Sequence, residues 1–83
     1  MRLEVLTPGK VAVDAEVDEV TVPGLAGEAG VLPGHTPLIV ALKAGTVSWR
    51  AKGGGGALTV GEGYCEVDGK DRVVVLTRSA EKA

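Results

Sequence analysis

Apolar and polar residues alternate along most of this chain, which is the period of half-buried β-strands. Leu3 and Val5 alternate with charged neighbours, and the same pattern continues over residues 11–17. Pro8 and Gly9 lie between these two segments. Because proline fixes φ and glycine accepts positive φ, this pair predicts a tight hairpin turn between two strands.

The alternation changes phase after the second segment. Val17 has odd parity, whereas Val20 and Val22 have even parity. A shift by one residue would turn every following side chain to the opposite face of a sheet. We therefore expect a β-bulge or a corner near Asp18 and Glu19.

Residues 23–37 interrupt the regular pattern and hold three of the four prolines. They predict a shaped loop with at most a short strand at residues 30–32. The following run, residues 38–42, is continuously apolar, which suits a fully buried strand and is short for a helix.

The second half of the chain predicts four more strands, over residues 46–51, 57–60, 64–67 and 72–77. Lys52 and the glycines at 53–56 predict a flexible hairpin tip. Asp68 and Gly69 predict a two-residue hairpin turn. Only residues 79–83 could begin a helix.

About ten short strands joined by turn signals predict an all-β fold, a β-sandwich or flattened barrel, with residues 1–83 as one domain. The chain has no Phe, and Trp49 and Tyr64 are its aromatic residues, so the core must be aliphatic. Burying a Val or Leu contributes roughly 1.5–3 kcal/mol, against a backbone entropy cost of similar total size. We expect a partner surface to help stabilise so small a domain.

Composition narrows the classes of partner. Nine basic and eleven acidic residues give a net charge of −2, whereas nucleic acid requires a concentrated basic surface. The amino terminus lacks the apolar core of a signal peptide, and every apolar run is far shorter than the ~20 residues that span a bilayer. The sequence predicts a soluble protein that does not insert into a membrane and would reach one through a partner.

Candidate catalytic chemistry is sparse. Beyond scattered carboxylates it rests on His35 and Cys65, and a cysteine-histidine dyad needs a third group to orient the base. Cys65 shares strand parity with Val67, as a small buried hydrophobe would. One His and one Cys are too few ligands for a closed tetrahedral metal site. The sequence therefore predicts no catalytic site, no metal and no cofactor.

Two further patterns partly resemble the motifs of other protein classes but lack the residues that those motifs need. Lys43 lies near a turn, as a lipoyl or biotinyl attachment lysine would, but its neighbours Leu42 and Ala44 differ from those of such carriers. The glycines at 53–56 lack a following Lys-Ser/Thr pair, which a P-loop needs.

A free-standing β adaptor or carrier domain with an unrelated protein partner is the alternative function. A thiol-dependent enzyme is the third possible function.

The Pro- and Gly-rich loop at residues 27–38 is the strongest candidate for a binding site. A loop rich in both rigid and permissive residues holds a specific backbone path, which nothing in the core requires. On local chemistry alone, it could equally be an elaborate turn between sheets in which His35 caps a carbonyl group.

The same residues carry a family resemblance. The stretch from Val22 to Gly45 is similar to the signature of the epsilon subunit of the F-type ATP synthase, with Gly30 and Pro33-Gly34-His35 as its most specific part. Further matches lie at Leu3–Pro8, Glu16–Asp18, Glu66–Val67 and Val73–Leu76, so the similarity covers nearly the whole chain.

The resemblance implies a function. In the family, this β-sandwich is a non-catalytic part of the central stalk that grips the gamma subunit and rests on the polar loops of the membrane c-ring, coupling proton-driven rotation to ATP synthesis. By position, Glu28 would face the ring loops, and His35 would lie at the gamma and ring contact. The implied contact loop comprises Glu28, Gly30, Pro33, Gly34 and His35. The implied location is the cytoplasmic face of the bacterial plasma membrane, as a peripheral part of the complex.

The chain departs from the family pattern at two places. Glu62-Gly63-Tyr64 stands where the family often has Gly-Gly-Phe, so a bend is expected there in altered form. The carboxyl-terminal helical hairpin of longer members is missing, as in a naturally short member or a shortened chain.

Overall fold

A computed structural model of the chain describes residues 1–82, which form ten β-strands and no helix. The strands are β1 (Arg2–Thr7), β2 (Lys10–Glu16), β3 (Glu19–Gly24), β4 (Gly27–Val31), β5 (Leu38–Leu42), β6 (Gly45–Ala51), β7 (Gly54–Val60), β8 (Gly63–Val67), β9 (Arg72–Thr77) and β10 (Ala80–Lys82). The all-β prediction with about ten strands is confirmed.

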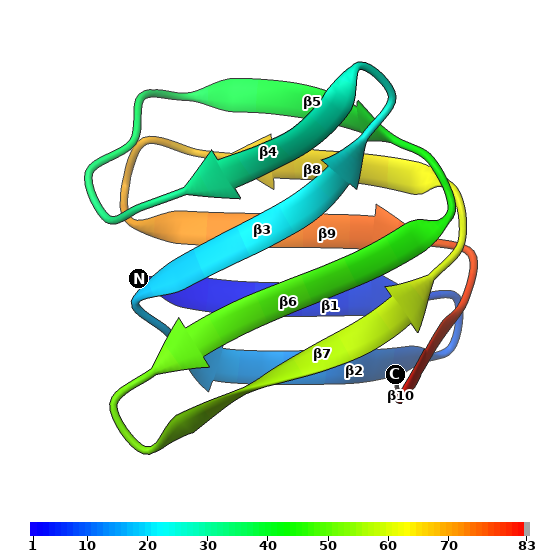
Figure 1. The fold of residues 1–83 in the computed structure, drawn as a ribbon, viewed down its shortest axis with the longest axis horizontal. Coiled ribbons are helices and arrows are strands. Elements are labelled where there is room, and N and C mark those ends of the chain that lie inside the picture. The colour runs from blue at the N-terminus through cyan, green and yellow to red at the C-terminus, as the bar shows by residue number, and fades with distance from the viewer. Residues whose placement is uncertain (83) are drawn as a thin grey trace.

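One hydrogen-bonded sheet folds over on itself to make the two layers of a β-sandwich (Figure 1). The first layer has the order β5-β8-β9-β1-β2, and the second has the order β10-β7-β6-β3, with β4 paired to the other side of β3. Gly24 of β3 and Leu42 of β5 join the layers. β1 and β9 are parallel, and the other pairs are antiparallel.

The predicted corner and the first hairpin are both present. β2 ends at Glu16 in the first layer and β3 begins at Glu19 in the second, so the phase change marks the point where the chain changes layers. Gly9 adopts a φ of 93° in the turn between β1 and β2. The first hairpin also contains a bulge that the parity did not predict, because Val5 pairs with Val13 but Leu6 pairs with Val11, which leaves Ala12 as an extra residue.

The core between the layers is aliphatic, as predicted. Inward-facing residues of both layers are fully buried, with Leu3, Val5, Val73 and Val75 from the first layer among them. The ring of Trp49 is half-buried and packs against this core. The complete absence of Phe is therefore accommodated by many small contacts rather than by a few large ones.

The loop predicted over residues 23–37 is wrong in its first half. Residues 27–31 form β4, which pairs with β3 from Val20–Val31 to Gly24–Gly27. Alternation is preserved across the glycines, because Ala29 packs against the core and Val31 is fully buried. The irregular connection is reduced to residues 32–37.

The prediction of a fully buried strand at residues 38–42 is also wrong. Ile39 is 70% exposed and Leu38 is 37% exposed, while Leu42 is buried. The parity that faces the second layer is buried at Leu42 and half-buried at Val40, while Leu38, at the start of the strand, stays partly exposed. The apolar residues of the other parity lie on the outer face of the first layer.

The glycines at 53–56 were predicted to be a flexible tip, but Gly54 to Gly56 belong to β7 and pair with β6. Their smallness has a packing reason. A Cβ at Gly56 would lie 2.5 Å from Cζ2 of Trp49, and one at Gly55 would overlap the carbonyl oxygen of Trp49. Gly56 therefore leaves the space that the indole ring occupies, and Gly55 allows the backbones of β6 and β7 to approach closely.

Two predictions near the carboxyl end are corrected. The β8–β9 connection has four residues, 68–71, rather than two, because the Asp68 carboxylate accepts a hydrogen bond from the Lys70 amide at 2.6 Å and Asp71 adopts a φ of 67°. Residues 80–82 form β10 against β7 and not a helix. Ala83, the end of the predicted helix, lies outside the described residues.

Candidate contact surfaces

The five residues of the predicted contact loop fall at two places along one edge of the sandwich. Glu28 and Gly30 lie on β4 and are exposed, whereas Pro33, Gly34 and His35 lie in the connection that follows it. Three strand residues separate Glu28 from the end of β4, a distance of ~10 Å. A partner that contacts all five residues must therefore extend along this edge.

His35 is half-buried and held by its own loop. Its backbone N–H donates to the carbonyl oxygen of Leu32 at 3.1 Å. Its Nδ1 lies 2.7 Å from the carbonyl oxygen of Thr36, and a carbonyl can only accept, so Nδ1 carries the proton. The imidazole ring thus caps a carbonyl group, and its Nε2 can accept a hydrogen bond from a partner.

Backbone conformation explains one of the two signature glycines, Gly34, but not the other, Gly30. Gly34 adopts a φ of 84°, which favours glycine. Gly30 has no such φ, and a Cβ added there would meet nothing within 4 Å. Packing within residues 1–82 therefore does not explain the glycine at position 30, which leaves the surface of β4 open to the close approach of another molecule.

The connection at residues 32–37 is supported from the other side by the β8–β9 turn. A Cβ at Gly69 would lie 2.6 Å from Cγ of Pro37, so the two segments are in contact. Both lie at the left end of the molecule in Figure 1. This contact fixes the path by which the chain leaves β4 and enters β5.

A second candidate surface lies on the outer face of the first layer, and the sequence analysis did not predict it. The strand register places five apolar side chains in one line across β5, β8, β9, β1 and β2. We call this line the outer apolar row, and it consists of Ala41, Tyr64, Leu76, Leu6 and Val11. Leu25 extends it, since its amide donates to the carbonyl oxygen of Ala41 at 3.0 Å.

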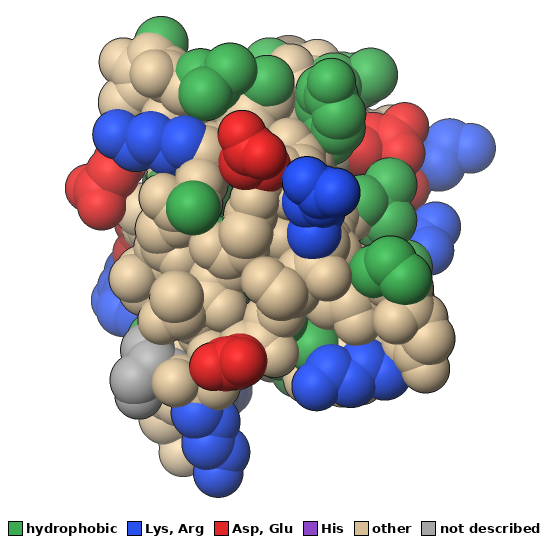
Figure 2. Space-filling model, turned by 90° about the vertical axis from the view of Figure 1, so that its right-hand side faces the viewer, with side chains coloured by type: hydrophobic (Ala, Val, Ile, Leu, Met, Phe, Trp, Pro, Cys, Tyr) green, Lys and Arg blue, Asp and Glu red, His purple; other side chains and the backbone are tan. Residues whose placement is uncertain are grey.

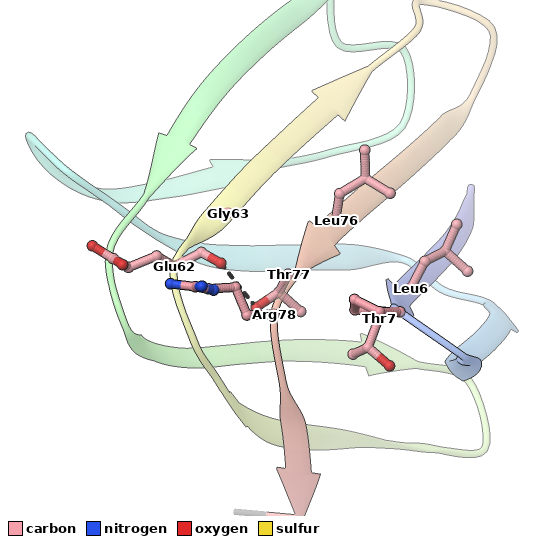
Figure 3. A pocket seen from close by; sticks show the side chains of 8 residues that line it. Leu6, Thr7, Glu62, Gly63, Leu76, Thr77 and Arg78 are labelled. Carbon is pink, nitrogen blue, oxygen red and sulfur yellow. Dashed lines mark hydrogen bonds between the residues drawn. The ribbon is translucent and has the colours of Figure 1, made fainter.

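Two shallow pockets accompany the row at one end of the strands. The first has a volume of about 500 Å³ and lies beside Leu6 and Leu76, with Glu62 and Arg78 at its margin (Figure 3). The second, of about 390 Å³, lies beside Tyr64 and Leu25. Figure 2 views this end of the sandwich and shows apolar side chains along its upper and right-hand borders, beside exposed charges.

The line next to the apolar row is mixed, and the strand register places in it Ile39, Glu66, Val74, Glu4 and Asp14. On β1 and β9, the Glu4 carboxylate accepts from Nε of Arg72 at 2.6 Å, and Asp14 on β2 accepts from Arg2 at 2.6 Å. Glu66 on β8 is exposed and forms no ion pair within residues 1–82. The border of the apolar row therefore retains one uncompensated carboxylate in line with these two ion pairs.

The outer face of the second layer has a different character. Thr21, Thr46, Ser48 and Thr59 project from it, and the single prominent charge pair is Glu19 with Arg50, whose Nε donates to Oε1 of Glu19 at 2.7 Å. The two outer faces of the sandwich are thus chemically distinct. One presents large apolar side chains and the other presents small hydroxyl groups.

Cys65 is fully buried on β8, between Val40 and Val75. Burial raises the pKa of its thiol from the usual 9.0 to about 11. The residue therefore behaves as the small hydrophobe that its parity predicted, and the hydrogen bonds of His35 go to Leu32 and Thr36 of its own loop.

Among residues 1–82, no group of three or more His, Cys, Asp and Glu side chains is placed to hold a metal ion. No helix in this part of the chain is long and apolar enough to cross a membrane.

Sequence reasoning could have found the outer apolar row. Val5-Leu6 and Val73-Val74-Val75-Leu76 are consecutive apolar residues within strands, and consecutive strand residues point to opposite faces. Such runs must expose apolar side chains unless both faces of the sheet are covered. The arrangement of those residues in one line depends on the register, which the sequence did not provide.

Comparison with known families identifies this architecture. The family described as ATP synthase, Delta/Epsilon chain, beta-sandwich domain matches residues 1–83, which is the entire chain. This chain belongs to that family. The family resemblance deduced from Gly30 and Pro33-Gly34-His35 is confirmed.

Individual relatives agree with the family assignment. The chain is 45% identical over 83 residues to the ATP synthase epsilon chain of Geotalea daltonii and 46% identical over 81 residues to epsilon chain 2 of Syntrophotalea carbinolica. It is covered to 100% and 98% by these matches but spans only 59% and 58% of the two relatives.

Solved structures show the same fold at low sequence identity. A chain in the Euglena gracilis mitochondrial ATP synthase structure of OSCP, F1 and c-ring matches with a TM-score of 0.89 and 24% identity, over 96% of this chain and 51% of that one. A chain in the Tetrahymena thermophila central stalk and c-ring structure matches with a TM-score of 0.82 and 13% identity, over 98% and 65%.

Proposed function

We propose that this chain is a non-catalytic subunit of the central stalk of an F-type ATP synthase. In this role it links the gamma subunit to the c-ring and couples proton-driven rotation to ATP synthesis. The observation that carries the proposal is the match of the family to the whole chain, on a ten-stranded sandwich that resembles chains of solved ATP synthase assemblies. Its proposed location is the cytoplasmic face of the bacterial membrane, held there by its partners.

The edge formed by β4 and residues 32–37 is the proposed contact with the ring. Glu28 and Gly30 are exposed there, and Nε2 of His35 can accept a hydrogen bond. Exposed polar groups on this edge can form hydrogen bonds with the polar loops of the ring, and such a contact does not require a large buried apolar surface. Pro33 and Gly34 fix the backbone that presents the histidine.

The direct test is reconstitution of an ATP synthase that has been depleted of its epsilon subunit. We expect this chain to restore proton-linked ATP synthesis in vesicles, measured as ATP formed after an imposed pH gradient. A complex that binds the chain and yet makes no more ATP than the depleted complex would contradict the coupling role. A chain that does not bind the depleted complex at all would contradict membership of the stalk.

Charge reversal at Glu28 provides a residue-level prediction. We expect Glu28→Lys to weaken association with the c-ring several-fold, while the free energy of unfolding stays within about 0.5 kcal/mol, because an exposed carboxylate contributes little to folding. Binding to purified c-ring and urea denaturation would measure the two effects. The matched control is Glu81→Lys on β10, which should leave ring binding unchanged. If Glu28→Lys unfolds the domain, the carboxylate is structural.

Gly30 tests the same edge without a change of charge. Gly30→Ala should fold normally, since its Cβ would meet nothing within 4 Å, and should be at least as stable as the parent chain because alanine restricts the unfolded chain. We expect it to weaken ring binding if a partner approaches β4 closely. Unchanged ring binding would show that β4 is not part of the contact.

A further inference from the structure

We propose that the free edge of β4 accepts an extended segment of the partner subunit as an additional antiparallel strand. The backbone groups of Glu28 and Gly30 would hold this segment by main-chain hydrogen bonds, and its side chain opposite Glu28 would be basic. This inference rests on the proposed function for the identity of the partner, and it adds how the β4 edge recognises that partner.

β4 is the least protected of the free sheet edges. Among residues 1–82, three strands pair with a neighbour on one side only, and they are β2, β4 and β10. β2 contains a bulge and three charged side chains, and β10 has three residues, two of them charged. Bulges, charges and short length keep an edge from pairing with another chain. β4 has five residues in unbroken register, with neither Lys nor Pro, so its edge is open to pairing.

Pro23 fixes the direction of the backbone groups of β4. In an antiparallel pair of strands, opposite residues alternately exchange two hydrogen bonds or none. Pro23 lies opposite Glu28 and has no N–H, so this is a pair without hydrogen bonds. Its carbonyl oxygen accepts instead from the amide of Lys43, at 3.0 Å. By alternation, Ala29 is bonded to β3, whereas Glu28 and Gly30 direct their N–H and C=O groups to the free edge.

The free edge therefore presents two donors and two acceptors of the main chain. Within residues 1–82, β4 pairs with β3 alone, and no turn or loop hydrogen bond reaches these groups. Glu28 and Gly30 are two residues apart, ~7 Å along the strand, which is the repeat of hydrogen-bonded pairs in an antiparallel sheet. A Cβ at Gly30 would meet nothing within 4 Å, so no side chain of this domain stands in the way of a strand there.

Apolar side chains lie where the added strand would cover them. In Figure 1, β5 of the first layer extends beyond β4 on the side away from β3. Leu38 has the parity that faces the second layer and is nevertheless 37% exposed, and Val40 is half-buried. A strand added to β4 would extend the second layer over these two side chains. Their burial would add to the affinity that the hydrogen bonds provide.

The exposed carboxylate of Glu28 selects the kind of strand. It forms no ion pair within residues 1–82. Cross-strand pairs of opposite charge stabilise a sheet, and like charges destabilise it, so a basic residue opposite Glu28 is favoured. Pairing of two copies through β4 would place both Glu28 carboxylates on one face of the shared sheet. Because each copy also has a net charge of −2, a second copy is the poorer match.

Hydrogen exchange in the isolated chain, followed for each residue by NMR, tests the direction of the backbone groups. We expect the amide of Ala29 to exchange roughly a hundredfold more slowly than the amides of Glu28 and Gly30, because only the first is bonded within the sheet. Slow exchange of Glu28 and Gly30 in the monomer would overturn the inference, since their N–H groups would already have partners.

A comparison of Gly30→Pro with Gly30→Ala tests the pairing itself. Both replace the glycine, but proline also removes the N–H that points to the free edge. An edge strand tolerates proline where the N–H faces solvent, so both variants should fold, which circular dichroism would check. Should Gly30→Pro not fold, Glu28→Pro removes the other free N–H, with Glu28→Gln as its control. We expect Gly30→Pro to bind an ATP synthase depleted of its epsilon subunit roughly tenfold more weakly than Gly30→Ala, because an acceptor of the partner loses its donor.

The outcomes separate this inference from the proposed function. Equal binding of the folded proline variant and its control would show that the partner does not pair with the backbone of β4, and only the inference would fail. Self-association of the parent chain that Gly30→Pro abolishes would also overturn it, because a second copy would then be the added strand. If the parent chain does not bind the depleted complex, the proposed function fails as well.

Discussion

Gly63→Ala is expected to destabilise the domain by about 3 kcal/mol or more, which is a large part of the stability of a small domain. A Cβ at this position would overlap the carbonyl oxygen of Leu76 and lie 2.9 Å from Cα of Thr77. Both atoms belong to the backbone of β9, which is paired on both sides, with β8 and β1. Neither can move without disturbing the middle of the first layer. Urea denaturation followed by circular dichroism would measure the loss.

The control for this substitution is Gly30→Ala, which makes the same chemical change at a strand glycine with open space around it. Its denaturation midpoint should stay at or above that of the parent chain. If both substitutions cost the same free energy, the loss would reflect glycine replacement in strands in general, and the close approach of β8 and β9 would not be its cause. The test also concerns Glu62-Gly63-Tyr64, where this chain differs from the Gly-Gly-Phe of the family. The glycine that is retained there, Gly63, is the one with no room for a Cβ.

Stability is expected to fall by about 2 to 3 kcal/mol as the pH rises from 9 to 11, because of Cys65. The pKa of the buried thiol is raised from the usual 9.0 to about 11, so the unfolded chain releases its proton first. The thiol therefore contributes its full stabilisation below pH 9 and loses it as the pH rises through the folded value. Each unit of difference in pKa corresponds to about 1.4 kcal/mol. Urea denaturation at half-unit intervals of pH would follow the change.

Cys65→Val is the matched control, because valine fills a similar volume beside Val40 and Val75 and cannot ionise. All other titrating groups are the same in the two proteins. The difference between their stabilities should therefore be constant below pH 9 and should shift in favour of the valine variant above it. A pH-independent difference, or rapid reaction of the native thiol with a disulfide reagent at pH 8, would contradict the burial of Cys65.

The glycines illustrate how far reasoning from sequence extends. Gly9 follows proline between two alternating segments, and its role in a tight turn could be predicted because it depends on adjacent residues alone. The role of Gly56 could not be predicted in the same way. A side chain at this position would collide with the indole ring of Trp49 on the neighbouring strand. Four glycines in succession indicate flexibility by composition, yet here three of them pair with β6 in a strand, and one of these, Gly56, lies against the aromatic ring.

The prediction of a loop at residues 27–31 failed for a related reason. Prolines on either side and glycines within it predicted an irregular loop, and the local rules behind that prediction concern the preferences of isolated residues. β3 provides the hydrogen-bond partners that make residues 27–31 a strand, and the burial of Val31 stabilises it. Backbone pairing between distant or adjacent strands can override weak local preferences, because each paired group would otherwise remain unsatisfied in a partly buried position.

The sequence by itself determined the all-β architecture, the aliphatic core, the corner before β3 and the family, because each depends on parity, composition or a short local motif. The tertiary structure alone decided which apolar residues meet on the outside. Leu6, Tyr64 and Leu76 are 12 to 70 positions apart in the sequence and lie in one line only because the register of β8, β9 and β1 aligns them. Parity tells which face of a strand a side chain occupies, but the face of a whole sheet is assembled by hydrogen bonds between strands, and these are set by the entire chain.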